Sequence, residues 1–306
     1  MKSISILGIY AADLVFFADS IPIKGETILG KDFVIGPGGK GSNQAVAVAK
    51  AGGNVKFISK IGDDQFGKMA IKIYEDAGVD YSNVIQTKEH DTGTAGIFVN
   101  KVTGENAITV VPGAAGKITK QDIDNSSQTI KESSVFLTQL EVPIEVAEYA
   151  IQVASMNKVT TILNPAPAVK LKEKTLNLID YFTPNETEAS FYVNHKVESE
   201  EDAKRAGHQL LDRGIKNVII TLGKQGAYFA NEKENFHINA YDLREKVVDT
   251  TGAGDGFNAG LAVALSEKKN IKDAIQFANA LAGLSTTKIG TAKSMPERLE
   301  IDKLND

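Results

Sequence analysis

The sequence predicts an α/β protein with a mostly parallel central sheet, helices on both faces of that sheet and a small separate β-sheet. Short apolar, β-rich runs alternate with amphipathic helical patterns through much of the chain, as in sheets built from strand–helix–strand units. Two further pairs of β-rich segments have no helical pattern between them. With 306 residues, 42% of them hydrophobic, the chain is long enough to build one large domain with a full core.

The strands and helices of the central sheet are placed by their patterns and end signals. Residues 217–222 form an almost unbroken β-rich apolar run, which is typical of a parallel strand covered on both faces. Glycines follow the predicted helices at 43–51 and 65–76, and Ser199 begins another helix with a sequence that resembles a capping box. The expected strands are residues 3–9, 55–59, 134–137, 160–163, 180–183 and 217–222. The expected helices are residues 43–51, 65–76, 143–156 and 199–214, with a further one from Phe257.

The small sheet is predicted from four β-rich segments that lack a crossover helix. Residues 14–17 and 31–35 are joined by a Pro- and Gly-containing connection, and the sequence KVTGE between 94–100 and 106–111 suggests a hairpin. We expect these strands, within approximately 10–36 and 92–112, to be inserted in a single domain of residues 1–306. A bare sheet with one apolar face needs a cover, either a ligand cleft or a partner chain.

Composition excludes several classes of function. The net charge is −5 without a long basic run, which argues against nucleic-acid binding. There is no Cys, so disulfides and thiolate metal sites are excluded, and the four His are scattered. No stretch reaches the ~18 apolar residues of a membrane span, and Asp13 interrupts the apolar run near the start. We therefore expect a cytoplasmic protein that does not bind a membrane.

The stretch DTTGAGDGFNAG, residues 249–260, places two carboxylates around small residues where a helical pattern begins. At a helix N-terminus the first backbone N–H groups lack partners and the dipole is positive, so Gly252, Ala253 and Gly254 predict an anion hole. The alternative is a tight strand–helix turn with Asp255 as a solvated acid. A carboxylate beside an anion site repels the anion unless it takes part in the chemistry. Asp255 is therefore interpreted as a base for an attacking hydroxyl in phosphoryl transfer.

The stretch GPGGKGSNQA, residues 36–45, also precedes a helix. It fails the Walker A pattern because Gly41 follows Lys40 where Ser or Thr is required. Its glycines allow close approach of the backbone to a ligand, and Asn43 and Asp13 can hydrogen-bond hydroxyl groups. A flexible loop is the alternative.

Two further stretches follow predicted strands. In TPNETE, residues 183–188, Asn185 can cap a helix, and a hydrated Mg²⁺ held by one or two of the acidic groups is the functional alternative. In TLGKQG, residues 221–226, a glycine turn closes the strand at 217–222. Open α/β sheets bind ligands at the carboxyl ends of their strands.

Together these stretches resemble the ribokinase family of carbohydrate kinases over essentially the whole chain. The resemblance consists of seven motifs in order: Asp13, GGKGSNQA, QLEVP (139–143), NPAPA (164–168), NETE (185–188), TLGKQG and DTTGAGD. It implies ATP-dependent phosphorylation of the primary hydroxyl of a sugar, with D-ribose as the expected acceptor. It further implies Mg²⁺, a monovalent cation such as K⁺, and a homodimer formed through the small sheet, which would be a lid.

The resemblance also assigns roles to single residues. Asp255 would be the base, and Gly252, Ala253 and Gly254 the anion hole. The residues lining the sugar pocket would be Asp13, Gly39, Lys40, Asn43, Glu141 and Asp255. The nucleotide and its phosphates would be held by Asn185, Thr221, Gly223, Gly226, Gly254 and Asn279, with Glu188 serving Mg²⁺. The monovalent cation site would map to Asp249, Thr251, Ser285, Lys288, Gly290 and Ser294, partly through backbone carbonyls.

One position departs from the family pattern. Ribokinases usually read G-S-x-N-x-D near the first strand, with the Asn touching ribose, and Ala11 stands at that position here. A buried hydroxyl without a partner costs about 1–3 kcal/mol, roughly ten- to a hundredfold in binding. Either Tyr10 or water compensates, or the substrate lacks or repositions that hydroxyl. Alternatives are therefore a kinase for 2-deoxyribose, another pentose or hexose, or a nucleoside, and a non-catalytic sugar-binding homologue.

Overall fold

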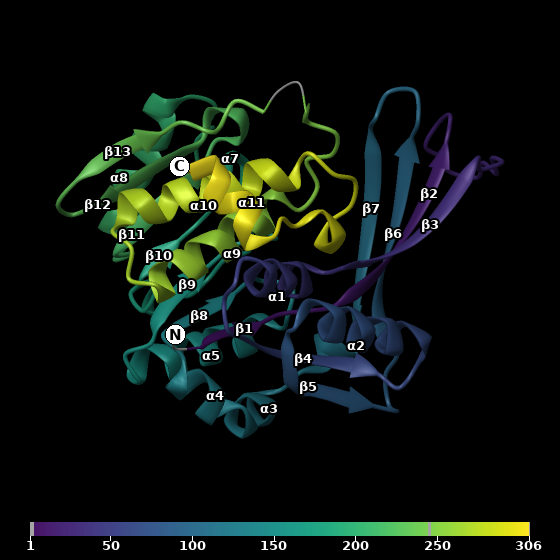
Figure 1. Cartoon of the computed structure of the whole chain (residues 1–306), viewed down its shortest axis with the longest axis horizontal. Helices are drawn as coiled ribbons and strands as arrows, with labels where there is room; N and C mark the ends of the chain where they lie inside the picture. Colours follow the sequence, from purple (N-terminus) through teal and green to yellow (C-terminus); the bar gives the residue numbers. More distant parts are fainter. Residues whose placement is uncertain (1–2, 244–245, 306) are drawn as a thin grey trace.

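The computed structural model describes residues 3–243 and 246–305 of the chain. Its main body is a nine-stranded sheet with the order β13-β12-β11-β10-β9-β8-β1-β4-β5, and helices cover both faces (Figure 1). The strands from β5 to β11 in this order pair in parallel, whereas β12 and β13 are antiparallel. These strands are β1 (Ile4–Leu7), β4 (Val55–Gly62), β5 (Asp80–Thr87), β8 (Val135–Thr138), β9 (Thr160–Leu163), β10 (Tyr181–Phe182), β11 (Asn217–Thr221), β12 (Ala227–Asn231) and β13 (Asn235–Ile238). The predicted parallel α/β sheet is confirmed.

Two apolar cores lie on opposite faces of this sheet. One core is formed with α1 (Lys40–Lys50), α2 (Gln65–Ala77), α9 (Ala253–Ser266), α10 (Ile271–Ser285) and α11 (Arg298–Asn305). The other is formed with α3 (Lys120–Asn125), α4 (Ser127–Glu132), α5 (Ile144–Met156), α6 (Glu173–Leu176), α7 (Glu186–Val193) and α8 (Glu200–Asp212). Short 3-10 helices lie at Ala114–Lys117, Gly223–Gln225 and Ala292–Ser294. The layered packing places the N-terminal ends of α1 and α9 side by side on the first face.

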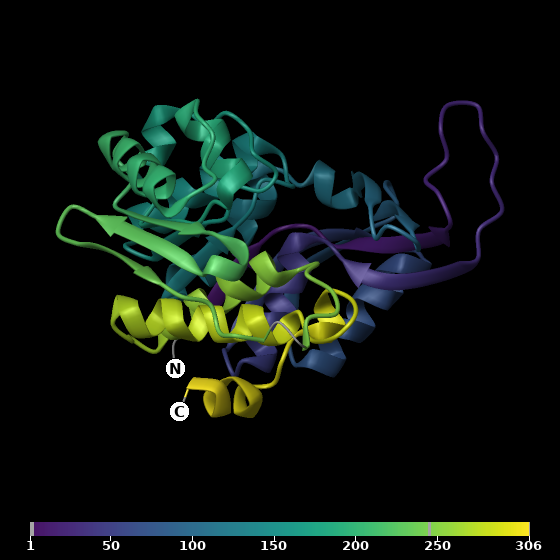
Figure 2. The ribbon, with the colours of Figure 1, turned by 90° about the horizontal axis from the view of Figure 1, so that it is seen from above.

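The small sheet is a separate, mixed layer of four strands in the order β3-β2-β6-β7. It stands beside the main body, and the connection between β2 and β3 extends away from it (Figures 1 and 2). Its strands are β2 (Ala11–Ala18), β3 (Asp32–Gly38), β6 (Thr92–Asn100) and β7 (Asn106–Gly113). The predicted hairpin is confirmed as the antiparallel pair β6–β7, and we call this sheet the lid.

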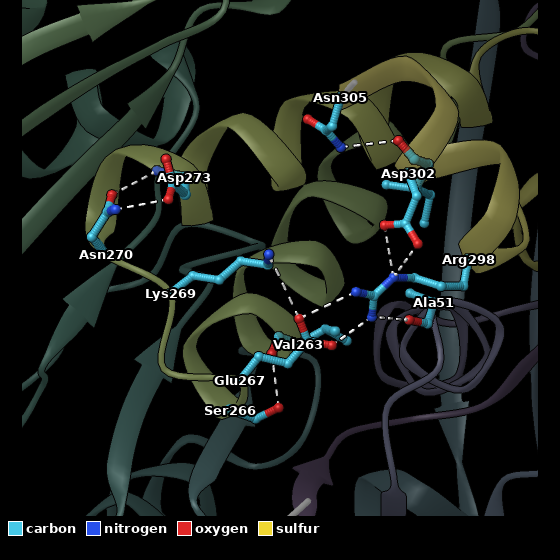
Figure 3. A network of polar contacts seen from close by, with 11 residues as sticks. Ala51, Val263, Ser266, Glu267, Lys269, Asn270, Asp273, Arg298, Asp302 and Asn305 are labelled. Atoms are coloured by element: carbon cyan, nitrogen blue, oxygen red, sulfur yellow. Dashed lines mark hydrogen bonds and ion pairs between the residues drawn. The ribbon is translucent and has the colours of Figure 1, made fainter.

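A network of charged side chains ties the C-terminal helix to the first face of the main sheet. Arg298 at the start of α11 donates to Glu267, which follows α9, to Asp302 and to the carbonyl oxygen of Ala51, which follows α1 (Figure 3). The Arg298 side chain therefore contacts the C-terminal ends of both α1 and α9, the two helices whose N-terminal ends lie side by side.

Several expectations about elements are corrected. The helix expected at 43–51 begins earlier, at Lys40, directly after Gly39, whose φ of 85° lies in the left-handed region. The lid strand β3 runs on to Gly38, because it is an edge strand and tolerates Pro37. Residues 246–248, which precede the turn at 249–254, pair with no strand in the described chain; the Val248 amide donates to the Thr286 carbonyl oxygen instead.

No helix in the described ranges, 3–243 and 246–305, is long and apolar enough to cross a membrane.

Candidate active site

Asp255 lies in the first turn of α9 and is 5% exposed, so it is not the solvated acid of the alternative interpretation. Both carboxylate oxygens accept hydrogen bonds from the first turns of α1. Asn43 Nδ2 donates to Oδ2 at 3.0 Å, and Gln44 Nε2 donates to Oδ1 at 3.0 Å. Two amides from consecutive residues therefore hold a buried carboxylate in one orientation.

Backbone amides without partners lie beside this carboxylate. Gly252 is the N-cap of α9, with a φ of 82°, and no side chain caps the helix. The Ala253 amide donates to the Thr250 carbonyl oxygen at 3.2 Å, whereas the amides of Gly252, Gly254 and Asp255 have no acceptor in the part of the chain that the structure describes. A Cβ added at Gly254 would meet no heavy atom within 4 Å. The predicted anion-accepting turn therefore has open space in front of it, and the amides of Gly252 and Gly254 are free, as is that of Asp255.

A cavity of about 160 Å³ opens at this turn. It is lined by Lys40, Asn164, Ala166, Thr183, Asn185, Glu188, Thr221, Gly252, Gly254, Asp255 and Asn258. These residues come from the carboxyl ends of β9, β10 and β11 and from the N-termini of α1, α7 and α9. Strand ends and helix N-termini thus converge as expected for a ligand site in an open α/β sheet.

On the lid side of Asp255, acidic groups surround Lys40. The Lys40 amide donates to Glu141 Oε2 at 2.9 Å. The Asp255 carboxylate is the main cause that raises the pKa of the Lys40 ammonium above its ordinary value, and Glu141 and Glu188 add to it against the effect of burial. The Lys40 ammonium group therefore stays protonated among these carboxylates.

The acids Asp13 and Glu141 bind protons more tightly than usual. Burial, and then the charge of Asp255, raise the pKa of Asp13 to about 6. Burial raises the pKa of Glu141 to about 7, although Lys40 opposes the rise.

Asp13 lies directly against Gly38, where a Cβ would be 2.2 Å from its Oδ1. Since Asn43 Oδ1 is buried without a partner in the described chain, an acceptor remains here for a ligand hydroxyl.

Asn185 and Glu188 form a complete capping box at the start of α7. Asn185 Oδ1 accepts from the Glu188 amide at 2.8 Å, and the Glu188 carboxylate accepts from the Asn185 amide at 2.9 Å and from Nδ2 at 3.1 Å. The capping interpretation is confirmed, yet both side chains also line the cavity. Burial is the main cause that raises the pKa of Glu188.

The glycine turn after β11 has the backbone conformations that only glycine adopts easily. Gly223 and Gly226 have φ values of 51° and 98°, and a Cβ at Gly226 would lie 2.1 Å from the Ile238 carbonyl oxygen. Asn279 on α10 donates to the carbonyl oxygens of Ile238 and Asn239 at 3.4 and 3.3 Å. Thr221 lines the cavity, whereas these three residues lie outside its lining.

The residues proposed for a monovalent cation lie on two segments that Asp249 joins, the turn at 249–251 and the stretch from the end of α10 to Ser294. Asp249 Oδ1 accepts from the Thr251 amide at 2.9 Å, and Oδ2 accepts from the Gly290 amide at 3.0 Å. The hydroxyls of Ser285 and Ser294 donate to the backbone carbonyls of Ala282 and Thr291, and Lys288 Nζ pairs with Glu300. The described residues contain no group of three or more His, Cys, Asp or Glu side chains that could together hold a metal ion.

Sequence reasoning missed three buried amides that organise the site: Gln44, Asn164 and Asn258. Gln44 also donates to Asn164 Oδ1 at 3.3 Å, and Asn258 Nδ2 donates to the Gly254 carbonyl oxygen at 2.8 Å. A signal for Gln44 was present, because the residues after it in α1 are small and apolar on every side of the helix, which predicts burial all round.

An α/β sheet that carries, at its strand ends, a buried carboxylate beside free amides of a helix N-terminus defines a kinase of small hydroxylated molecules. The chain belongs to the pfkB family of carbohydrate kinases, whose family model matches residues 1–298.

Curated and solved relatives extend over nearly the whole chain. The chain is 39% identical to a ribokinase of Haemophilus influenzae, covering 98% of this chain and 97% of the relative. It is 33% identical to a deoxyribokinase of Salmonella typhi, covering 99% and 97%. The structure of Arabidopsis thaliana ribokinase complexed with ribose and ATP matches with a TM-score of 0.93 and 29% identity, covering 99% of this chain and 98% of that one.

Proposed function

We propose that this chain is a ribokinase, which transfers the γ-phosphoryl group of ATP to the primary hydroxyl of D-ribose and forms ribose 5-phosphate and ADP. The observation that carries the proposal is the position of Asp255, a buried carboxylate that borders a cavity next to backbone amides without acceptors. The ribokinase names of the relatives and the ribose and ATP in the Arabidopsis structure support the choice of substrates.

In this proposal the chain supplies a base and an anion hole. A carboxylate oxygen of Asp255 accepts the proton of the primary hydroxyl as that oxygen bonds to the γ-phosphorus. The bond from the γ-phosphorus to the bridging oxygen breaks, and its electron pair leaves with ADP. The amides of Gly254 and Asp255 stabilise the negative charge of the moving phosphoryl group, within the turn formed by Gly252, Ala253 and Gly254.

The sugar binds on the lid side of Asp255 in this account. Asp13, Glu141 and the free Oδ1 of Asn43 accept hydrogen bonds from sugar hydroxyls, and Lys40 and the backbone at Gly39 act as donors. A polar pocket of this kind orients a polyol. The burial of the carboxyl groups of Asp13 and Glu141, which raises their pKa values, supports placing the pocket here.

The nucleotide binds on the other side, along the ends of β10 and β11. We assign Asn185 and Thr221 to the phosphates, the turn with Gly223 and Gly226 to the nucleotide, and Asn279 to the adenine end. Glu188 fits a hydrated Mg²⁺, because its carboxylate borders the cavity and Mg²⁺ is held by few carboxylates and several waters. When bound, Mg²⁺ neutralises charge on the phosphates.

A monovalent cation site is proposed between the two segments that Asp249 joins. The residues assigned to it are Asp249, Thr251, Ser285, Lys288, Gly290 and Ser294. The hydroxyl and carbonyl oxygens of these segments are suitable ligands for K⁺, and Lys288 would contribute its carbonyl oxygen because its ammonium pairs with Glu300. The expected outcome is activation of turnover by K⁺ salts over choline salts at equal ionic strength; equal rates would refute the site.

A second acceptor, 2-deoxyribose, is favoured by one observation. Ala11 is 1% exposed and offers no side-chain hydrogen bond to a sugar hydroxyl. The deoxyribokinase relative is consistent with this alternative.

A panel of acceptors tests the proposal. ADP formation is measured with ribose, 2-deoxyribose, other pentoses, hexoses and nucleosides. The highest kcat/KM is expected for ribose. A higher value for 2-deoxyribose selects the second function, and the absence of phosphorylation with every sugar identifies a non-catalytic homologue.

We further propose that the chain is one domain with the lid inserted, and that it forms a homodimer through the lid. Phe33 and Phe98 both pack against Phe16 in the lid, although each of the three rings is 38–47% exposed. An exposed aromatic patch of this kind needs a cover, and a second copy supplies one. Light scattering should give twice the chain mass for the wild type and a monomer for Phe98→Glu; a monomeric wild type would refute the dimer.

A further inference from the structure

We propose that Gln44 is the positioning residue of the base, and that it fixes the carboxylate of Asp255 without contacting the sugar or the nucleotide. The inference rests on the proposed function, in which Asp255 accepts a proton. Gln44 is fully buried, and its Nε2 lies 3.0 Å from Asp255 Oδ1.

Every hydrogen-bonding group of the Gln44 side chain has a partner. One Nε2–H is directed to Asp255 Oδ1 and the other to Asn164 Oδ1 at 3.3 Å. The Oε1 atom accepts from Gln139 Nε2. A side-chain amide has two donors and one carbonyl oxygen, so no donor of Gln44 is left for a ligand.

These partners also determine which way the amide faces. If the amide were turned over, Oε1 would face the oxygens of Asp255 and Asn164, and Nε2 would face the donor on Gln139. Acceptors would then oppose acceptors in a buried site, which costs free energy because no water replaces the lost hydrogen bonds. The donor is therefore held toward Asp255.

The amides beyond Gln44 continue to the strand ends. Asn164 follows β9, and its Nδ2 donates to the Thr183 carbonyl oxygen at 3.3 Å. Gln139 follows β8 and is 1% exposed. The chain of donation thus runs from Gln139 through Gln44 and Asn164 to Thr183, so Gln44 is anchored to two strands of the main sheet.

Asn43 provides the contrast that separates positioning from binding. It donates to the other oxygen of Asp255, but its own Oδ1 is buried without a partner in the described chain, so it can also accept from a sugar hydroxyl. Gln44 has no such group. Loss of Asn43 should therefore change both sugar KM and kcat, whereas loss of Gln44 should change kcat.

The test compares Gln44→Met with the matched control Gln139→Met. Both substitutions remove one buried amide of the same size, but only the first removes a donor to Asp255. We expect kcat to fall roughly 10- to 100-fold in Gln44→Met, as for a misplaced catalytic group, with sugar KM changed less than about threefold. In Gln139→Met, kcat should stay within about threefold of the wild type. Thermal unfolding of both variants controls for folding.

Two results would overturn the inference: a kcat of Gln44→Met within about threefold of the wild type, or a loss confined to KM. A crystal structure of Gln44→Met gives a readout that does not depend on the reaction, because Asp255 should leave its position on Asn43 and turn toward the cavity. An unmoved Asp255 would count against positioning. A wild-type chain that phosphorylates no sugar would refute the proposed function instead, and the structure would still decide the role of Gln44.

Discussion

Asn43 Nδ2 on α1 lies 3.0 Å from Oδ2 of Asp255 on α9, although the two residues are 212 positions apart in the sequence. This hydrogen bond joins the N-terminal parts of the two helices. The two helices pack together, and Arg298 contacts the backbone or side chains beyond their other ends. The geometry of the proposed base therefore depends on how these helices pack as well as on the side chains of the site.

Substitution of Gly254 should separate catalysis from stability. A methyl group at this position meets no atom of the protein within 4 Å, and alanine favours a helix over glycine by about 0.5–1 kcal/mol. The methyl group would nevertheless point into the space where the phosphoryl group is proposed to lie. We expect Gly254→Ala to unfold no earlier than the wild type while its kcat/KM falls at least about tenfold. Wild-type activity in this variant would contradict the proposed anion hole.

The pH dependence of stability follows from Glu141. Burial raises its pKa to about 7 in the folded chain, so the folded state holds the proton more tightly than the unfolded state does. This contribution to the free energy of unfolding is fully present below the unfolded pKa of about 4.5 and is lost as pH rises through 7.

Glu141→Gln should therefore raise the free energy of unfolding relative to the wild type at pH 8, by on the order of 1–3 kcal/mol, and much less at pH 5. Urea unfolding at the two pH values measures the difference. A gain of equal size at both pH values would show that the ionisation of Glu141 is not its cause.

The Arg298 network predicts a loss of stability away from the site. The Glu267 side chain is 14% exposed and pairs with Arg298, so Arg298→Ala leaves a partly buried carboxylate without this partner. We expect a loss of about 2 kcal/mol in the free energy of unfolding. Lys72→Ala is the control, because its ion pair with Asp76 is exposed; its unfolding midpoint should not change. Equal effects of the two substitutions would contradict the structural role of the network.

Ala11 gives a prediction about the acceptor. An asparagine at this position would restore the side chain that ribokinases usually present to ribose. We expect Ala11→Asn to lower the KM for ribose about tenfold, which corresponds to one additional buried hydrogen bond. Acceptor kinetics with ribose and 2-deoxyribose measure it. An unchanged KM for ribose would show that water already occupies the position.

Much of the fold was predictable because its signals are local. The buried strands, the helix cap at Asn185 and the lid hairpin each follow from short patterns, and the structure confirms them. The role of Asp255 as a base was inferred from its place beside the predicted anion-accepting turn. The partners of Gln44 were not predictable, because they depend on the register at which α1 crosses α9 and on the ends of β8 and β9. That register is determined by the packing of the core, so no short stretch of the sequence predicts it.

The most direct test of the account is the turnover of Asp255→Asn together with sugar binding. Asparagine keeps the size of the side chain but cannot accept the hydroxyl proton, so we expect kcat to fall about a hundred- to ten-thousandfold. Calorimetry should show ribose binding within about threefold of the wild type. Near-normal turnover in a variant that binds ribose would contradict the assignment of Asp255 as the base and, with it, the proposed mechanism.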